Sequence, residues 1–314
     1  MAVQIGVDLG GTNIAVGLVD EECRLLCKKS VPTGAGRPYT DIAADMADMA
    51  RVLLEEQDVP LSCCRSMGVG VPGTCDGQTG MVRFAANLFW EDVPLRSALK
   101  KHIDLPVFIS NDANCAALGE QLAGGARGYR SVVCVTLGTG VGGGIILDGK
   151  LFEGNRSMGT EVGHTVIDPA GPQCNCGRRG CFETFASSTA LVRQTRELME
   201  REPDSGLEEF LQKNGKISGR TAFLAARAGN DAGLRLVRQY VRYLGIGITN
   251  LINIFMPEAV LLGGGISGEG EYLLEPLRQY VREHVYGGSR APEVAILKAT
   301  LGNDAGIIGA AMLQ

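Results

Sequence analysis

The sequence contains few aromatic residues, no long apolar run and no excess of positive charge. Aromatic residues make up 5% of the 314 residues, with one tryptophan, and the net charge is −5. Such a mildly acidic chain has no electrostatic reason to bind nucleic acid or an anionic membrane. No apolar run reaches the about 18 residues that a membrane-spanning helix needs, and the first residues lack the basic and apolar regions of a signal peptide. We therefore expect a cytoplasmic protein without nucleic-acid or membrane partners.

Three of the ten cysteines are clustered, at positions 174, 176 and 181, and a histidine precedes them at 164. Thiols stay reduced in the cytoplasm, where clustered cysteines are more often metal ligands or catalytic groups than disulfides. Cys174, Cys176, Cys181 and His164 would fill all four positions of a tetrahedral Zn²⁺, which indicates a structural site. A redox dithiol of Cys174 and Cys176 is the alternative, but it leaves the other two ligands without a role.

Two halves of the chain repeat the same pattern. Residues 3–20 and 131–148 each predict a strand, a glycine turn and a second strand, while residues 110–119 and 302–311 each place Asn-Asp before a helix of small residues. This repetition predicts a duplicated α/β domain with two facing lobes. Apolar spacing further predicts helices over 40–57, 94–102, 112–124, 186–201, 220–229, 231–255 and 271–286, and strands near 66–71, 107–110 and 259–262.

The glycine turns are candidate nucleotide-binding elements, because bare backbone N–H groups and a threonine hydroxyl suit a phosphate. A single turn of this kind is more often just a hairpin turn, but the pair in repeated halves favours phosphate binding from two sides. Asp8 is placed to hold a phosphate-bound Mg²⁺ directly or through water. A third glycine run follows the strand near 259–262, where backbone could approach an adenosine. The candidate residues are Gly10, Gly11, Thr12, Asn13, Gly138, Thr139, Gly140, Gly263, Gly264 and Gly265.

Together these motifs resemble the ROK family of repressors, open reading frames and kinases, within the superfamily of sugar kinases, Hsp70 and actin. The likeness rests on DLGGTN (8–13), ANLFW (86–90), SNDANCAALGE (110–120), LGTGVGGG (137–144), EVGH (161–164), CNCGRRGC (174–181) and LGGG (262–265). Within the family the chain is most similar to the ATP-dependent glucokinases. Only seven residues precede Asp8, so we expect no N-terminal helix-turn-helix of the kind that repressor members carry.

The resemblance implies a two-lobed, actin-like (ribonuclease H-like) fold with an interlobe cleft that closes on its substrates. It implies a smaller lobe over 1–111, completed by the C-terminal helix 303–314, and a larger lobe over 112–302 that contains the zinc knuckle 164–181. It also suggests a homodimer or homotetramer.

The resemblance further implies a phosphotransferase that uses ATP and Mg²⁺, with Asp112 as the general base for the sugar hydroxyl. An N-terminal cap of the following helix is the alternative role of this residue, and we expect Asp304 in the second repeat to be such a cap. Trp90 is expected in the core. The residues expected to bind the hexose are Gly73, Asn87, Asn111, Asp112, Glu161, His164 and Glu183.

We therefore expect phosphorylation of a hexose at its 6-hydroxyl, with glucose as the first candidate. N-acetylmannosamine, fructose and allose remain alternative substrates, because the ATP turns, the base and the zinc site would be common to all these kinases. A catalytically silent sugar-sensing regulator is the alternative from another class of protein. The intact Asp112 and the two phosphate turns argue against it.

Overall fold

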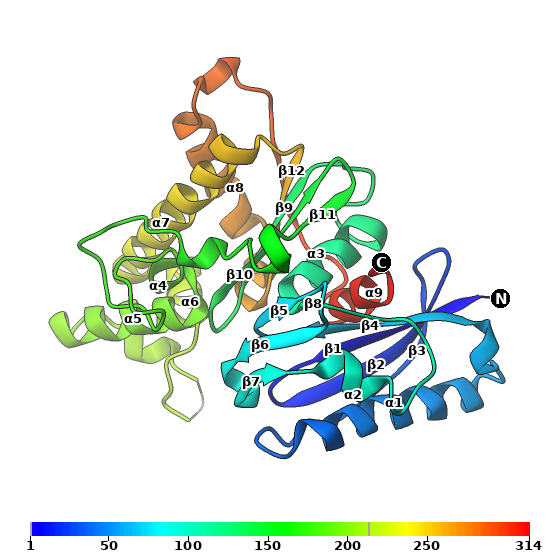
Figure 1. Ribbon diagram of the computed structural model, residues 1–314. Coiled ribbons are helices and arrows are strands. Elements are labelled where there is room, and N and C mark those ends of the chain that lie inside the picture. The colour runs from blue at the N-terminus through cyan, green and yellow to red at the C-terminus, as the bar shows by residue number, and fades with distance from the viewer. Residues whose placement is uncertain (1, 213) are drawn as a thin grey trace. The chain divides into compact units, whose positions relative to one another are not determined.

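The computed structural model describes residues 2–212 and 214–314, which divide into two compact units (Figure 1). The first unit contains the chain up to Val132, Gly144–Thr160 and Thr300–Gln314, and the second contains Val133–Gly143 and Glu161–Ala299. Each unit is described by itself below.

A five-stranded sheet in the order β3-β2-β1-β4-β8 forms the centre of the first unit. Its strands are β1 (Val3–Leu9), β2 (Asn13–Asp20), β3 (Leu25–Pro32), β4 (Cys64–Val71) and β8 (Val107–Asn111). β1 and β2 form the predicted antiparallel hairpin, and β4 runs parallel to β1. Alternate residues of β1, such as Ile5 and Val7, join a core with helix α1 (Tyr39–Glu56).

The opposite face of this sheet carries glycines that let a helix lie on the backbone. A Cβ on Gly6 would stand 2.0 Å from Ile307 O, and one on Gly68 would stand 1.7 Å from Ala310 O. Helix α9 (Asp304–Ala311) therefore packs directly onto β1 and β4, with α1 on the other side (Figure 1). A side chain at either glycine would push α9 off the sheet.

Helix α3 (Asp112–Ala123) also packs against α9 through close backbone contacts at glycines. A Cβ on Gly119 would stand 2.2 Å from Ala305 O, and one on Gly309 would stand 1.7 Å from Cys115 O. Because of this backbone contact α3 groups with the first unit. The lobe boundary expected from the sequence, between residues 111 and 112, would place α3 in the second lobe instead. Residues 144–160 also group with the first unit. A small sheet completes this unit, with β5 (Thr74–Asp76), β6 (Met81–Ala85), β7 (Trp90–Val93) and the short helix α2 (Leu95–Leu99).

A second five-stranded sheet has the order β11-β10-β9-β12-β13. Its strands are β9 (Val132–Leu137), β10 (Val141–Leu147), β11 (Lys150–Phe152), β12 (Ala259–Gly263) and β13 (Ala295–Lys298). The helices of the second unit are α4 (Glu183–Ala186), α5 (Ser188–Arg201), α6 (Thr221–Arg227), α7 (Asp231–Phe255) and α8 (Glu271–His284). The predicted helices and strands are confirmed, with ends that differ by a few residues. The predicted neighbours β9 and β10 are also confirmed.

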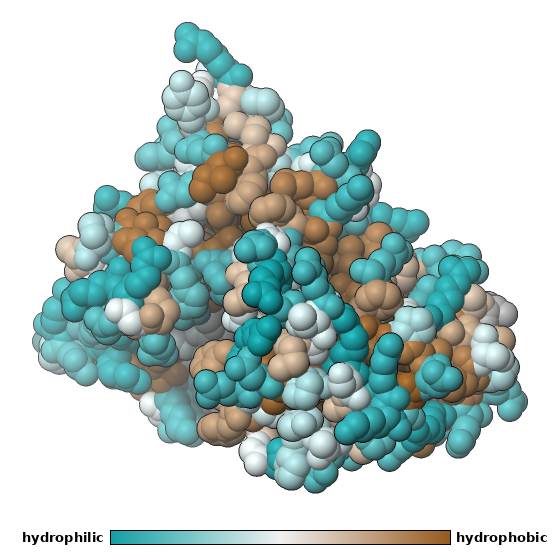
Figure 2. Space-filling view, viewed as in Figure 1, coloured by the Kyte–Doolittle hydropathy of each residue, from teal (hydrophilic) through white to brown (hydrophobic). Residues whose placement is uncertain are grey.

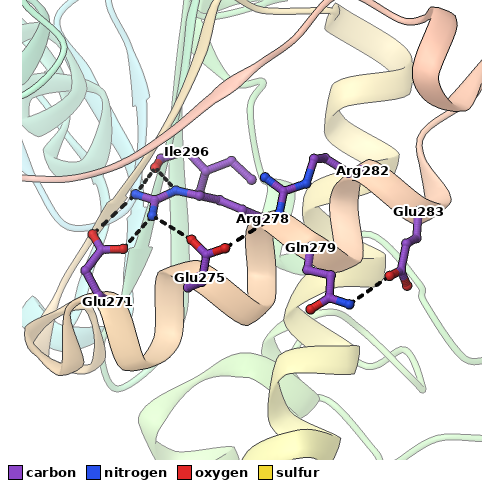
Figure 3. A network of polar contacts seen from close by, with 7 residues as sticks. All are labelled: Glu271, Glu275, Arg278, Gln279, Arg282, Glu283 and Ile296. Carbon is purple, nitrogen blue, oxygen red and sulfur yellow. Dashed lines mark hydrogen bonds and ion pairs between the residues drawn. The ribbon is translucent and has the colours of Figure 1, made fainter.

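Helix α8 is fixed to β13 by one arginine. Arg278 donates two hydrogen bonds to Ile296 O, at 3.1 and 2.9 Å, and pairs with Glu271 and Glu275 of its own helix (Figure 3). Glu275 also pairs with Arg282. The network joins the exposed face of α8 to the edge strand of the second sheet.

Hydrophilic residues cover much of the face shown in Figure 2. Among the described residues no helix is long and apolar enough to cross a membrane. All ten cysteines are described, and each is a free thiol rather than part of a disulfide, as the sequence predicts. Trp90 is buried in the core of the first unit, which confirms its expected place.

Candidate functional site

The first glycine turn joins β1 to β2 and is held by a buried threonine. Gly10 donates its N–H to Asn13 O at 2.8 Å, which closes the turn. Thr33 is fully buried and donates its N–H to Thr12 O at 2.8 Å and its hydroxyl to Gly10 O at 2.6 Å. Sequence reasoning missed Thr33; the available signal was its place just after β3, the strand beside the hairpin. The turn thus keeps a fixed backbone with its threonine and asparagine exposed.

Asp8 is the last but one residue of β1 and is half-buried next to this turn. Burial, together with the negative charge of Asp112, raises the pKa of Asp8 from 3.8 to about 6. The first turn of α9 contributes to the burial, because a Cβ on Gly306 would stand 3.0 Å from the Asp8 carboxyl carbon. Two neighbouring carboxylates in a partly desolvated position favour a bound cation, and oxygen donors of this kind suit Mg²⁺.

A pocket of about 540 Å³ lies beside the turn, wholly within the first unit. Asp8, the turn itself, β3 and the start of α9 line it, and Lys28 pairs there with Asp304 at 2.5 Å. The expectation that Asp304 is an N-terminal cap is wrong. Asn303 occupies the cap position with helical dihedral angles and no side-chain cap, and Asp304 is already the first helical residue. Its carboxylate is used by Lys28 instead.

Asp112 is the first residue of α3, directly after β8. The cap of this helix is Asn111, whose Oδ1 accepts the N–H groups of Ala113 and Asn114 at 2.8 and 3.3 Å. Asn111 also donates from Nδ2 to Gly73 O at 3.1 Å. The capping role considered for Asp112 therefore belongs mainly to its neighbour. Asn111 is committed to protein contacts, with one N–H of its amide still available to a ligand.

The first unit also places a candidate sugar ligand against the first glycine turn. A Cβ on Gly11 would stand 3.0 Å from the Cβ of Asn87, so the turn lies directly against this exposed side chain. Asn87 belongs to a short 3₁₀ turn between β6 and β7. Gly73 has φ 155° and lies against Phe84 O, where a Cβ would come within 2.2 Å. Any larger residue would displace the loop that Asn111 binds.

The second glycine turn, between β9 and β10, contacts a predicted sugar ligand of the second unit. Glu183 Oε2 accepts the N–H of Val141 at 2.9 Å, and a Cβ on Gly140 would stand 2.2 Å from the same oxygen. The third glycine run packs on this turn, because a Cβ on Gly264 would stand 2.5 Å from Leu137 O. Gly264 has φ 79°, which glycine adopts without strain. Residues far apart in the sequence thus form one glycine-rich surface.

The cysteine cluster brings four possible metal ligands together. One ligand atom each from His164, Cys174, Cys176 and Cys181 lies within 4.8 Å of all the others. Cys174 Sγ is 3.6 Å from His164 Nδ1, and Cys176 Sγ is 3.6 Å from Cys181 Sγ. Zinc–ligand bonds of about 2.0–2.3 Å in a tetrahedron separate the ligands by roughly 3.3–3.8 Å. The four residues therefore fit Zn²⁺ and are compatible with a structural zinc site.

The backbone around the cluster explains its spacing. Gly177 N–H donates to Cys174 O at 3.0 Å, and Gly177 and Gly180 have φ of 89° and 71°. A Cβ on Gly180 would stand 1.6 Å from Asp168 O, so the knuckle tolerates only glycine there. The N–H of Arg178 lowers the pKa of the Cys176 thiol, which favours the thiolate that a metal requires.

Glu161 and His164 lie on one short turn next to the cluster. The N–H of His164 donates to Glu161 O at 3.1 Å at the end of the turn Val162–His164. Nδ1 of His164 is the ring nitrogen that faces Cys174, which leaves Nε2 for another partner. Glu161 is exposed. The structure therefore couples the orientation of one predicted sugar ligand to the metal cluster.

The predicted site residues form two groups, one in each unit. The first unit brings together Asp8, Gly10, Gly11, Thr12, Asn13, Gly73, Asn87, Asn111 and Asp112. The second unit contains Gly138, Thr139, Gly140, Glu161, His164, Glu183, Gly263, Gly264, Gly265 and the three cysteines. Each group combines a glycine turn with polar side chains.

The chain is similar to known proteins over its whole length. The sequence model of the ROK family matches residues 4–314. The chain is 38% identical to the glucokinase of Streptomyces coelicolor over 317 aligned residues, which cover 100% of this chain and 98% of the relative. It is 32% identical to the xylose repressor of Caldicellulosiruptor bescii, with 90% of this chain and 70% of the repressor covered.

A crystal structure of a ROK family glucokinase from Streptomyces griseus, in complex with glucose and AMPPNP, matches with a TM-score of 0.81. Its identity is 37%, and the match covers 99% of this chain and 98% of that chain. The fold is accordingly the duplicated α/β fold of the actin-like ATPases, as the sequence predicts. Within that class, this chain belongs to the ROK family.

Proposed function

We propose that this chain is an ATP-dependent hexose kinase that phosphorylates glucose at the 6-hydroxyl. The observation that carries the proposal is the contact of Gly11, in the first glycine turn, with Asn87. In the proposal this turn binds phosphate and Asn87 binds the sugar. Phosphoryl transfer needs the γ-phosphate and the attacking hydroxyl to meet in a fixed geometry, and it needs little covalent chemistry from the protein. A rigid turn adjoining a sugar ligand meets that requirement.

The base in this proposal is Asp112. Its carboxylate is close enough to Asp8 to raise the pKa of that residue, so it lies near the phosphate turn. Asn111 holds the start of α3, and with it the position of Asp112, through the two cap hydrogen bonds. A base fixed in this way accepts the proton of the 6-hydroxyl as the oxygen attacks. Mg²⁺ bound near Asp8 would neutralise charge on the transferred phosphate.

The sugar ligands in this proposal are mostly polar side chains. Neutral amides and carboxylates of this kind can pair with hydroxyls that both donate and accept hydrogen bonds. The proposed ligands are Gly73, Asn87, Asn111, Asp112, Glu161, His164 and Glu183. Zn²⁺ in the Cys₃His cluster would fix the ring of His164 and leave Nε2 for a sugar hydroxyl. A homodimer or homotetramer is also expected.

A panel of sugars tests the proposal. Purified protein with ATP and Mg²⁺ is assayed for ADP release with glucose, mannose, fructose, allose, glucosamine and N-acetylmannosamine. We expect the highest kcat/KM with glucose. Highest activity on another sugar would support kinase activity but would show that glucose is not the preferred substrate. Sugar binding without turnover of any of the six would contradict the proposal and favour the sensing role, a possibility raised by the similarity to the xylose repressor.

A further inference from the structure

A buried carboxylate in the second unit has no part in the chemistry described so far. Glu269 ends a short 3₁₀ segment, Gly265–Glu269, that begins at the third glycine run. Its side chain is 2% exposed and pairs with Arg227 at 2.5 Å and with Arg220 at 3.4 Å. A buried charge is unfavourable unless it is paired, so at least one arginine is needed for stability.

The two arginines are used differently. Arg227, at the end of α6, also donates to Glu269 O at 3.0 Å and lies 4.8 Å above the ring centre of Tyr272. These contacts make it part of the packed structure. Arg220, just before α6, reaches the carboxylate through Nε, and 72% of its side chain is exposed. One edge of its guanidinium is therefore paired with Glu269, while most of the side chain is exposed to solvent.

Arg220 also adjoins the candidate nucleotide-binding surface. A Cβ on Gly219 would stand 2.5 Å from Ser188 Oγ and 3.9 Å from Ile266 Cγ1. Ser188 in turn donates its N–H to Gly138 O at 2.8 Å, in the second phosphate turn. The segment before α6 thus contacts Ser188, which binds the second glycine turn, and Ile266, which follows the third glycine run.

The third glycine run presents backbone without side chains on this surface. The glycine run at 263–265 packs against Leu137, and a Cβ on Gly265 would meet nothing within 4 Å. A nucleotide whose phosphates bind the second turn would extend its nucleoside over these glycines. Its base would then come to the neighbourhood of Arg220. A planar guanidinium held at one edge is well suited to stacking on an aromatic ring.

We propose that Arg220 is the base-binding residue of the nucleotide site, where its guanidinium stacks on the purine of a nucleoside triphosphate while Glu269 fixes its orientation. The inference rests on the proposed ATP-dependent function and adds a residue that contacts the base. Arg220 contacts the base rather than the phosphates, so its loss weakens nucleotide binding without affecting inorganic phosphate chains.

The experiment compares two probes on the full chain by isothermal titration: ADP, and inorganic tripolyphosphate, which has no base. For Arg220→Ala we expect the Kd of ADP to rise roughly 5- to 30-fold and that of tripolyphosphate to change less than about twofold. Arg220→Lys keeps the charge but loses the plane and should resemble the alanine variant. Unchanged ADP affinity in Arg220→Ala, or an equal loss for both probes, would overturn the proposal.

Arg235→Ala is the matched control, because Arg235 is another exposed arginine of this unit, paired with Glu202 on the surface. Its ADP affinity should equal that of the wild type. Arg227 still neutralises Glu269 in Arg220→Ala, so the thermal midpoint should change little. The two proposals can fail separately. A wild-type protein that binds ADP but phosphorylates no sugar would contradict the proposed kinase activity, and the ADP titration would still test the role of Arg220.

Discussion

The carboxylate of Glu183 accepts the backbone N–H of Val141, so a predicted sugar ligand also supports the second glycine turn. The bond is 2.9 Å long and joins the start of α4, which follows the zinc knuckle, to the start of β10. One side chain thereby connects three features that are separate in the sequence. Substitutions at this position should distinguish its two roles.

Glu183→Gln should keep the hydrogen bond to Val141, because the amide oxygen also accepts, but it loses the charged acceptor for a sugar hydroxyl. We expect the KM for glucose to rise about tenfold and the KM for ATP to change less than about threefold. Glu183→Ala removes both roles and should raise both constants. Steady-state kinetics with each substrate varied in turn measures the difference. Equal effects of the two variants on ATP would show that the bond to Val141 does not matter.

Asp112→Asn should lower kcat by roughly 10²–10⁴-fold, because an amide cannot accept the hydroxyl proton. The Kd values of glucose and ATP should stay within a few-fold of the wild type, as determined by titration calorimetry. The fold should be retained, since Asn111 provides the principal cap of α3. Asn111→Ala is the contrasting variant and should lower stability by about 1 kcal/mol through loss of that cap. Near-normal turnover in Asp112→Asn would remove it as the base.

Because of Asp8, the free energy of unfolding should fall as the pH rises from about 4 to about 6. Its pKa is about 6 in the folded state, against 3.8 for an unperturbed aspartate, so the folded chain binds more protons in this interval and loses stability as they dissociate. Asp8→Asn removes this cost, and without nucleotide it should be more stable by about 1–3 kcal/mol at pH 7 and nearly equal to the wild type at pH 4.

Urea denaturation across this pH range measures the effect. Asp112→Asn should give a smaller change of the same sign, because burial of Asp8 is the larger cause of its shift and the charge of Asp112 the smaller. A wild type and an Asp8→Asn variant with parallel pH profiles would contradict this account of the electrostatics.

Metal analysis should find about one zinc per chain. Cys181→Ser should abolish it and lower the thermal midpoint by about 10 °C or more, because a structural zinc contributes binding energy directly to folding. Cys63→Ser is the control, since this half-buried thiol lies outside the cluster and should retain both zinc and stability. A fully stable protein without metal would exclude the zinc site.

The sequence determined much of this protein because its signals are local. Glycine turns between alternating strands predict hairpins, amphipathic spacing predicts α1, α7 and α8, and the spacing of Cys174, Cys176 and Cys181 predicts a metal knuckle whose four ligand atoms do converge. Such features depend on residues near one another in the chain.

Only the tertiary structure decided the pairings between distant segments. The sequence predicted Asp304 as an N-terminal cap, but its carboxylate pairs with Lys28 of β3, which is 276 residues away in the chain. It assigned α3 to the second lobe, yet close packing of Gly119 and Gly309 groups this helix with α9. Thr33, Glu269 and Arg220 lie outside any motif, and strand register and helix packing give them their partners. These contacts depend on the packing of whole elements, which a local pattern does not encode.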